Sequence, residues 1–166
     1  YRNKDSIKTF LRYNGLNDEI EIALSKNAIS STNAVKRSES ISCKITNDFF
    51  IYKEFIDENK FKNKGYLIKL YAGEKYNLYV RDKKVFKEGE KAKTSLEHDR
   101  PPRIIDKQTV YIQYMSDLPK AVKLKYKKIS ELIAKEDQTK LAKLKKSFRK
   151  MSSLDKLISL ISNIDK

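Results

Sequence analysis

"YLIKLY" at Tyr66–Tyr71 and "YNLYVR" at Tyr76–Arg81 decide the fold of this chain, because they are two runs rich in aromatic and branched residues separated only by "AGEK". Residues of these kinds favour strands. A connection of three to five residues that contains glycine is typical of a β-hairpin. We therefore predict an antiparallel hairpin at this point of the chain.

Further strands are expected on both sides of the hairpin. Ile41–Ile45 alternates apolar and polar residues, Val85–Lys87 follows a turn-like stretch, and Thr109–Met115 ("TVYIQYM") is again rich in strand-favouring residues. Glu88–Arg103 is polar and contains two adjacent prolines, which predicts a long loop. The β-rich part, residues 59–116, therefore predicts an antiparallel sheet or small barrel of four to five strands.

The N-terminal part, residues 1–58, is expected to be mainly helical. Apolar residues at helical spacing predict a short helix at Asp5–Tyr13 and a second helix that begins after Asn17 or Asp18. Asp48–Ile56 fits a helix or a strand by its aromatic residues, and we favour the helix.

The C-terminal part, residues 117–166, also carries apolar residues at helical spacing and predicts basic helices. The expected helix starts are Asp117, Asp137 or Thr139, and Ser152 or Ser153. The order of helices, sheet and helices predicts an α+β fold. It consists of N-terminal helices, a central antiparallel sheet or small barrel and C-terminal basic helices, within one domain spanning 1–166.

Positive charge is concentrated in the last two thirds of the chain. The net charge is +15, and residues 1–58 contribute none of it, whereas 59–116 contribute +7 and 117–166 contribute +8. This asymmetry favours an anionic partner, which is a nucleic acid, an acidic membrane or an acidic protein. Thirty of the 37 cations are lysines, and Ile and Asn are abundant, as is typical of a low-GC organism. That composition weakens the inference, because arginine is the better phosphate reader.

The basic helices carry few acidic residues between their cations. "KLAKLKKSFRK" at Lys140–Lys150 has none. Like charges at helical spacing repel each other, and a phosphate backbone would relieve this repulsion while releasing its counterions. The cations expected to contact nucleic acid lie away from the apolar stripe, and they are Lys123, Lys127, Lys128, Lys143, Lys146, Arg149 and Lys150.

A second candidate surface comes from the strands. Side chains alternate across a strand, so a set of rings and cations from three strands should share one face. Rings stack on unpaired bases and cations pair with phosphates, which predicts contact with RNA or single strands. The alternative is that this face packs beneath a helix. The residues are Lys69, Tyr71, Tyr79, Arg81 and Tyr111.

Catalytic signals are sparse. His98 is the single histidine and stands near Arg100 and Arg103, which together would suit phosphate binding and metal-free RNA cleavage. The competing interpretation is an ordinary exposed loop histidine. The single Cys43 excludes an internal disulfide and a cysteine zinc site, and it has no evident base partner, so we expect it to be inert.

These observations favour a non-enzymatic, basic nucleic-acid-binding module with low sequence specificity, RNA being favoured, and with no cofactor and no metal. The alternatives are a small toxin-like RNA-cleaving enzyme that uses His98, a secreted or surface lysine-rich protein with a protein partner, and helices that lie on an anionic bilayer. No apolar run is long enough for a transmembrane segment. A cytoplasmic location is favoured, but secretion stays open because the chain starts at Tyr1 and not at Met.

Overall fold

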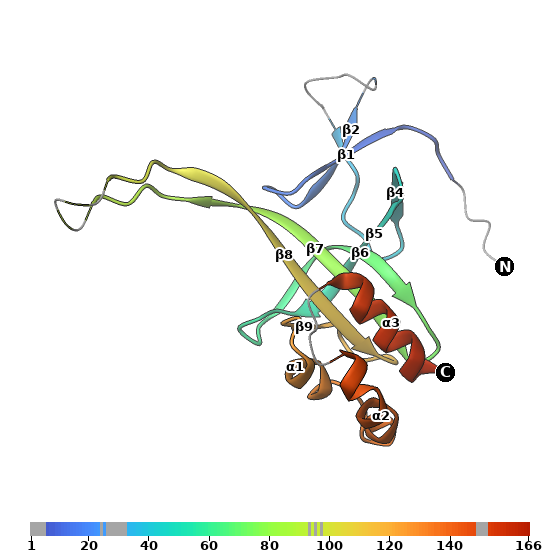
Figure 1. Ribbon diagram of the computed structural model, residues 1–166. Coiled ribbons are helices and arrows are strands. Elements are labelled where there is room, and N and C mark those ends of the chain that lie inside the picture. The colour runs from blue at the N-terminus through green and yellow to red at the C-terminus, as the bar shows by residue number, and fades with distance from the viewer. Residues whose placement is uncertain are drawn as a thin grey trace.

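The computed structural model describes residues 6–23, 25, 33–92, 94, 96, 98–148 and 153–166, and strands predominate among them. The strands are β1 (Phe10–Asn14), β2 (Glu19–Ala23), β3 (Asn33–Ala34), β4 (Ser42–Ile45), β5 (Asp48–Ile56), β6 (Lys62–Ala72), β7 (Tyr76–Lys87), β8 (Arg103–Tyr114) and β9 (Lys120–Val122). The helical segments are α1 (Tyr126–Ser130), the 3-10 turn η1 (Lys135–Asp137), α2 (Gln138–Phe148) and α3 (Leu154–Asp165). Figure 1 shows the helices gathered against one side of the strands.

Strands β4 to β9 form one sheet in chain order, and the predicted hairpin of β6 and β7 is confirmed. Within this sheet, the first and the last of the five strands from β5 to β9 also meet. Strand β5 pairs with β9 in parallel at Ile56 and Lys120. The backbone N–H of Ile56 donates to the carbonyl of Pro119 at 2.8 Å. This contact closes β5–β9 into a small barrel. A separate three-stranded sheet is formed by β1, β2 and β3.

The inside of the barrel is aromatic. Phe55, Leu67, Tyr79 and Tyr111 form one buried cluster there. The rings of Phe55 and Tyr111 meet edge to face with centroids 4.9 Å apart, a favourable geometry for aromatic pairs. These residues alternate along their strands with residues that point outward, so both faces of the central strands are buried.

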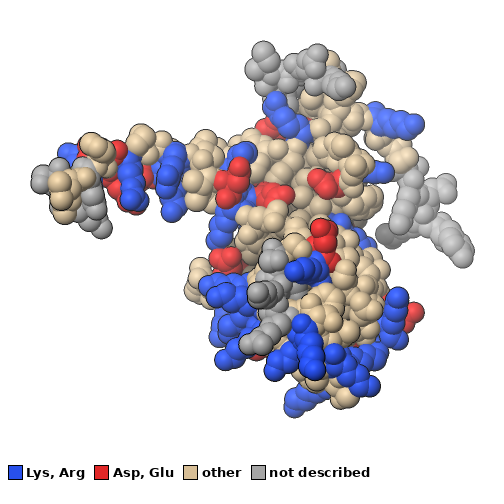
Figure 2. All heavy atoms as spheres, viewed as in Figure 1, with Lys and Arg blue, Asp and Glu red and all other residues tan. Residues whose placement is uncertain are grey.

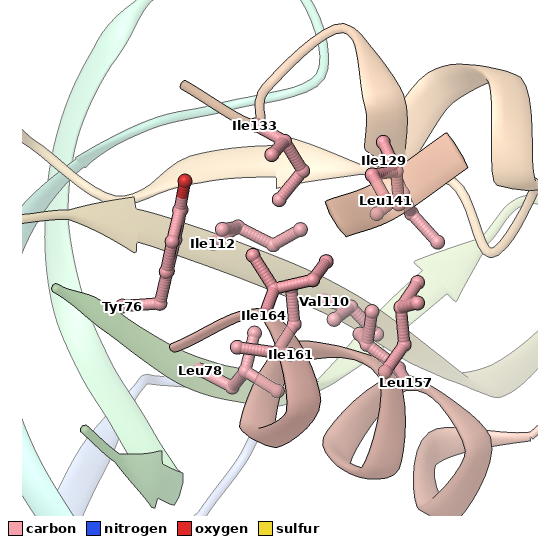
Figure 3. Close-up of a cluster of buried hydrophobic side chains, with 11 residues drawn as sticks. Tyr76, Leu78, Val110, Ile112, Ile129, Ile133, Leu141, Leu157, Ile161 and Ile164 are labelled. Atoms are coloured by element: carbon pink, nitrogen blue, oxygen red, sulfur yellow. The ribbon is translucent and has the colours of Figure 1, made fainter. Parts of the chain in front are cut away.

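The outside of the barrel carries the largest core, which fixes the C-terminal helices (Figure 3). Leu78 on β7 and Ile112 on β8 point towards Leu157 and Ile161 on α3 and towards the segment that contains Ile129. Burial of a side chain of this size contributes about 1.5–3 kcal/mol, so several such contacts are sufficient to hold three short helices on the strands. The cluster consists of Tyr76, Leu78, Val110, Ile112, Ile129, Ile133, Leu141, Leu157, Leu160, Ile161 and Ile164.

A second outer cluster joins the three-stranded sheet to the barrel. Ile20 of β2 is buried with Phe50 of β5, Tyr66 of β6 and Val80 of β7. The ring of Tyr13 on β1 lies 5.0 Å from that of Phe50, centroid to centroid. The small sheet therefore covers part of the barrel that the C-terminal helices leave open.

The hairpin of β7 and β8 is much longer than the barrel, and its distal half forms a projecting arm (Figure 1). The two strands pair continuously as far as Lys87 and Arg103, and an isolated bridge joins Glu90 to Arg100 beyond them. Val85–Lys87 is therefore the end of β7 and not a third strand. The segment Glu88–Arg103, expected to be a long loop, closes this hairpin and supplies the start of β8.

The predicted N-terminal helices are wrong, and the chain is mostly β. The described part of the predicted first helix, residues 6–13, runs into β1, the residues after Asp18 form β2, and Asp48–Ile56 is β5. The side-chain oxygen of Asn14 accepts hydrogen bonds from the backbone N–H of Leu16 at 3.1 Å and of Asn17 at 3.3 Å. This arrangement makes a turn between two strands, and asparagine is well suited to it.

The C-terminal helices are present, but the first begins later than expected. The segment after Asp117 forms β9, and helix α1 begins only at Tyr126. The carbonyl of Pro119 is used in barrel closure, which holds this segment extended. Ser153 caps α3 by accepting a hydrogen bond from the backbone N–H of Lys156, whereas Ser152 lies outside the described residues.

Candidate nucleic-acid interface

The helices are positioned so that their lysines face outward. Leu141 is the buried residue of α2, and the hydroxyl of Tyr126 donates to the Leu141 carbonyl at 2.9 Å, which ties α1 to α2. The ammonium group of Lys140 donates to the carbonyl of Ile164 at 3.1 Å and ties α2 to the end of α3. Because the apolar side of each helix is used for this packing, the remaining lysines are left on the surface.

Many lysines in this part of the chain are exposed, and most of them lie on and beside α1 and α2. Figure 2 shows Lys and Arg side chains gathered over the body of the molecule where the C-terminal helices lie, with few acidic side chains among them. We call six of the lysines on and beside these two helices the helical basic surface: Lys123, Lys127, Lys128, Lys143, Lys145 and Lys146.

Most of this surface is not neutralised. Lys128 forms an ion pair with Glu131 at 2.9 Å. Among the residues that the structure describes, Lys123, Lys127 and Lys143 have no ion pair, and the same holds for Lys145 and Lys146. Arg149 and Lys150, which were expected to extend it, lie outside the described residues.

The predicted stacking face on the strands is wrong. Tyr79 and Tyr111 are only 3% and 2% exposed, because their face of the sheet is the inside of the barrel. The two rings cannot stack on a base without opening the barrel. The alternation along β7 and β8 was predicted correctly, but the closure of the sheet buries the face that was expected to be free.

Arg81 has a structural role in place of the predicted phosphate contact. Its guanidinium pairs with the carboxylate of Asp18 at 2.8 Å and lies 5.0 Å from the ring centroid of Phe55. The carboxylate of Asp18 also accepts from the hydroxyl of Tyr13 at 2.7 Å. Arg81 thereby joins the barrel to the turn between β1 and β2.

The other two members of the predicted face are separated by a β-bulge. The pairing of β6 with β7 shifts by one residue between Lys69 and Tyr71. Such a bulge reverses the facing of the residues that follow it. Lys69 is exposed, whereas Tyr71 packs against the outer core and donates a hydrogen bond to Asp165 at 2.9 Å.

A polar group inside the barrel was not predicted. The amide oxygen of Gln113 accepts from the ammonium group of Lys53 at 3.0 Å and from the hydroxyl of Tyr79 at 2.8 Å. Burial lowers the pKa of Lys53. If Asp48–Ile56 had been predicted as a strand, Ile51, Lys53 and Phe55 would have been placed on one face. Lys53 would then have stood between two apolar residues. This polar group satisfies the buried polar atoms of one end of the barrel.

His98 lies near the tip of the arm, and the structure brings it together with its expected partners. His98, Arg100 and Arg103 line one open hollow with Glu90 and Asp99. The side chain of Arg100 lies 3.9 Å from the carboxylate of Glu90. The hollow therefore contains a histidine, two carboxylates and two guanidinium groups.

The described residues provide neither a reactive thiol nor a metal cluster. Cys43 is buried, and burial raises the pKa of its thiol, which disfavours the reactive thiolate. In the part of the chain with described coordinates, no group of three or more His, Cys, Asp or Glu side chains could hold a metal ion. In the same residues, no helix combines the length and the apolar composition needed to cross a membrane.

No family model matches the chain, and neither a curated protein nor a solved structure matches it significantly.

Proposed function

We propose that the protein binds nucleic acid through the helical basic surface, in a manner governed by charge and with little sequence preference. The observation that carries this proposal is the group of exposed lysines on and beside α1 and α2, five of which have no ion pair among the described residues while Lys128 pairs with Glu131. A cluster of like charges is unfavourable in the free protein, and phosphates would relieve it. Lysine ammonium groups act as point charges towards phosphate, so this surface would recognise the backbone and not the bases.

The expected preference for unpaired RNA has lost its basis. That preference depended on exposed tyrosines, and Tyr79 and Tyr111 are buried in the barrel. The proposal is therefore restricted to contacts with the phosphate backbone, which single strands and duplexes share.

The test is binding to a fluorescently labelled single-stranded RNA and to a DNA duplex over a series of salt concentrations. A Lys127→Gln, Lys143→Gln and Lys146→Gln triple variant should weaken binding to both ligands, by about tenfold at low salt. Its slope of log affinity against log salt should be smaller by about 2 to 3, because each lost phosphate contact removes roughly 0.7–0.9 from that slope.

A matched control removes three exposed lysines from the opposite end of the chain. In the control variant, Lys8, Lys36 and Lys44 are replaced by Gln; all three are exposed and form no ion pair among the described residues. The control changes the net charge by the same amount. Equal losses in the two variants would show that binding follows net charge alone and would exclude a localised site.

A second candidate is RNA cleavage in the hollow at the arm tip, which the proximity of His98, Glu90 and Arg100 favours. Either His98 or Glu90 would take the proton of a 2′-hydroxyl while its oxygen attacks the phosphorus, and the other would protonate the 5′-oxygen as its bond to phosphorus breaks. The guanidinium group would contact the phosphate. Incubation with a labelled RNA should then give cleavage that His98→Ala abolishes, and cleavage that persists in this variant would exclude the role.

A further inference from the structure

The arm has two chemically different faces. In an antiparallel pair, directly opposed residues share a face, and residues two apart along a strand share it as well. Lys83 opposes Lys107, and Lys87 opposes Arg103. We call the face formed by these four residues, together with the pair Val85 and Ile105 between them, the cationic arm face.

The acidic residues of the paired part of the arm lie on the other face. Asp82 accepts a hydrogen bond from the amide of Gln108 at 2.8 Å, and Asp106 forms an ion pair with Lys84 at 2.7 Å. The next opposed pair on that side is Phe86 and Ile104, which are 58% and 56% exposed. The separation of charge is therefore a property of the strand register and not of the overall composition.

The cationic arm face is unfavourable in the free protein. Like charges directly opposite one another destabilise a strand pair. The ammonium group of Lys107 forms an ion pair with the carboxylate of Glu58, which follows β5, at 2.9 Å. Within the described residues, Lys83, Lys87 and Arg103 have no ion pair. Lys83 shares a hollow with Asp57 and Glu58, and Arg103 shares one with Glu90 and Asp99, so nearby carboxylates reduce part of this repulsion and an external anion would reduce the rest.

The dimensions of the arm favour one groove of a nucleic acid duplex as its binding site. Two strands lie about 4.8 Å apart, and such a ribbon enters the major groove of B-form DNA, which is about 12 Å wide, but not the minor groove of about 6 Å. Each strand carries its own cations, Lys83 and Lys87 on β7 and Arg103 on β8, so each could reach a different phosphate wall. The two cation pairs are four residues apart, or about 13 Å.

From this geometry we propose that the arm enters the major groove of double-stranded DNA with the cationic arm face directed into the groove. The inference rests on the proposed function and narrows it to a duplex. Between the cations, Val85 and Ile105 would face the base edges, where an apolar side chain can contact only the thymine methyl group. The major groove of an RNA duplex is too deep and narrow for side chains to read, so RNA duplexes should be bound less well.

The test compares the full chain with a Lys83→Gln, Lys87→Gln and Arg103→Gln variant on three labelled ligands, namely a DNA duplex, an RNA duplex and single-stranded DNA. The DNA duplex should lose about tenfold in affinity and about 2 to 3 in salt slope, from three lost contacts of about 0.9 each. The other two ligands should change by less than about threefold.

Two further measurements make the result specific. A second variant, with Lys83→Arg and Lys87→Arg and with Arg103 unchanged, keeps all three positive charges. It should retain the affinity for the DNA duplex. Methylation of guanine N7, which lies in the major groove, should interfere with binding by the wild type but not by the arm variant.

The outcomes separate this inference from the proposed function. If the arm variant behaves like the control with Lys8, Lys36 and Lys44 replaced, while the helical variant loses binding, the arm inference is overturned and the proposed function stands. If the wild type binds no nucleic acid in a salt-dependent way, both are overturned. A loss confined to the DNA duplex supports the inference.

Discussion

Asp165, at the end of α3, joins the C-terminal helix to the β6–β7 turn. Its carboxylate accepts hydrogen bonds from the backbone N–H groups of Glu74 at 2.9 Å, Lys75 at 2.8 Å and Tyr76 at 3.2 Å, and from the hydroxyl of Tyr71 at 2.9 Å. Three backbone donors that converge on one turn require an acceptor when they are buried. This side chain therefore adds a polar attachment to the apolar contacts that hold the last helix on the barrel.

We predict that Asp165→Ala lowers the free energy of unfolding by about 2–4 kcal/mol, because several donors to a charged acceptor are left unpaired. Urea denaturation would measure this loss. Asp155→Ala is the control, since Asp155 is exposed in the first turn of the same helix, and its loss should stay below about 1 kcal/mol. Equal effects of the two substitutions would contradict the anchoring role.

Gly65 is a residue at which a larger side chain would disturb an ion pair. A Cβ atom at this position would lie 2.4 Å from the carboxylate oxygen of Asp18 and 2.9 Å from a guanidinium nitrogen of Arg81. We predict that Gly65→Ala displaces this ion pair and destabilises the protein by about 1–3 kcal/mol. In an Asp18→Ala background the same substitution should cost clearly less, which a double-mutant cycle of unfolding free energies would show. Strict additivity would refute the steric explanation.

At the scale of the element, local sequence defines strand edges and turns but not the number of partners that each strand has. The hairpin of β6 and β7 was predictable from its residues alone. The N-terminal strands were not recognised, although Ile20 and Ile22 alternate with glutamates in β2, because the apolar residues of 5–13 also fit a helical spacing. A tertiary contact favours the strand over the helix, because Ile20 is buried against the barrel.

The tyrosines inside the barrel make its stability sensitive to alkaline pH. Burial, supported by the charges of Glu58 and Asp57 and opposed by Arg81, raises the pKa of Tyr111 to about 12. A raised folded pKa means that the unfolded chain ionises first, near pH 10. The stabilisation by the neutral phenol is therefore complete below about pH 10 and is lost as the pH rises towards 12.

We predict that wild-type stability falls between about pH 10 and 12 by up to roughly 3 kcal/mol more than that of Tyr111→Phe. The other tyrosines are present in both proteins, so their contributions cancel in the comparison. Urea unfolding at a series of pH values would measure the difference. Parallel pH profiles would show that Tyr111 does not ionise preferentially in the unfolded chain.

At the scale of the whole molecule, the candidate site was only partly predictable. Charge counts indicate correctly that residues 117–166 carry a basic excess, and helical spacing places Lys127 and Lys143 away from the apolar residues. Barrel closure depends on the contact between Ile56 and Pro119, which are far apart in sequence. No local sequence pattern predicts such a contact. Neither the burial of Tyr79 and Tyr111 nor the projecting arm of β7 and β8 could therefore be predicted.

The same charge distribution predicts opposite effects of salt on stability and on binding. Salt screens repulsion between exposed charges, and most lysines of the helical basic surface have no acidic partner. Raising sodium chloride from about 20 to 300 mM should therefore increase the free energy of unfolding by roughly 0.5–1 kcal/mol, while the affinity for nucleic acid falls. Urea unfolding across this series would measure the first effect. The Lys127→Gln, Lys143→Gln and Lys146→Gln variant should show a smaller response in both. If wild-type stability instead declined with salt, attractive ion pairs would outweigh the repulsion and no electrostatic stress would remain for a phosphate backbone to relieve.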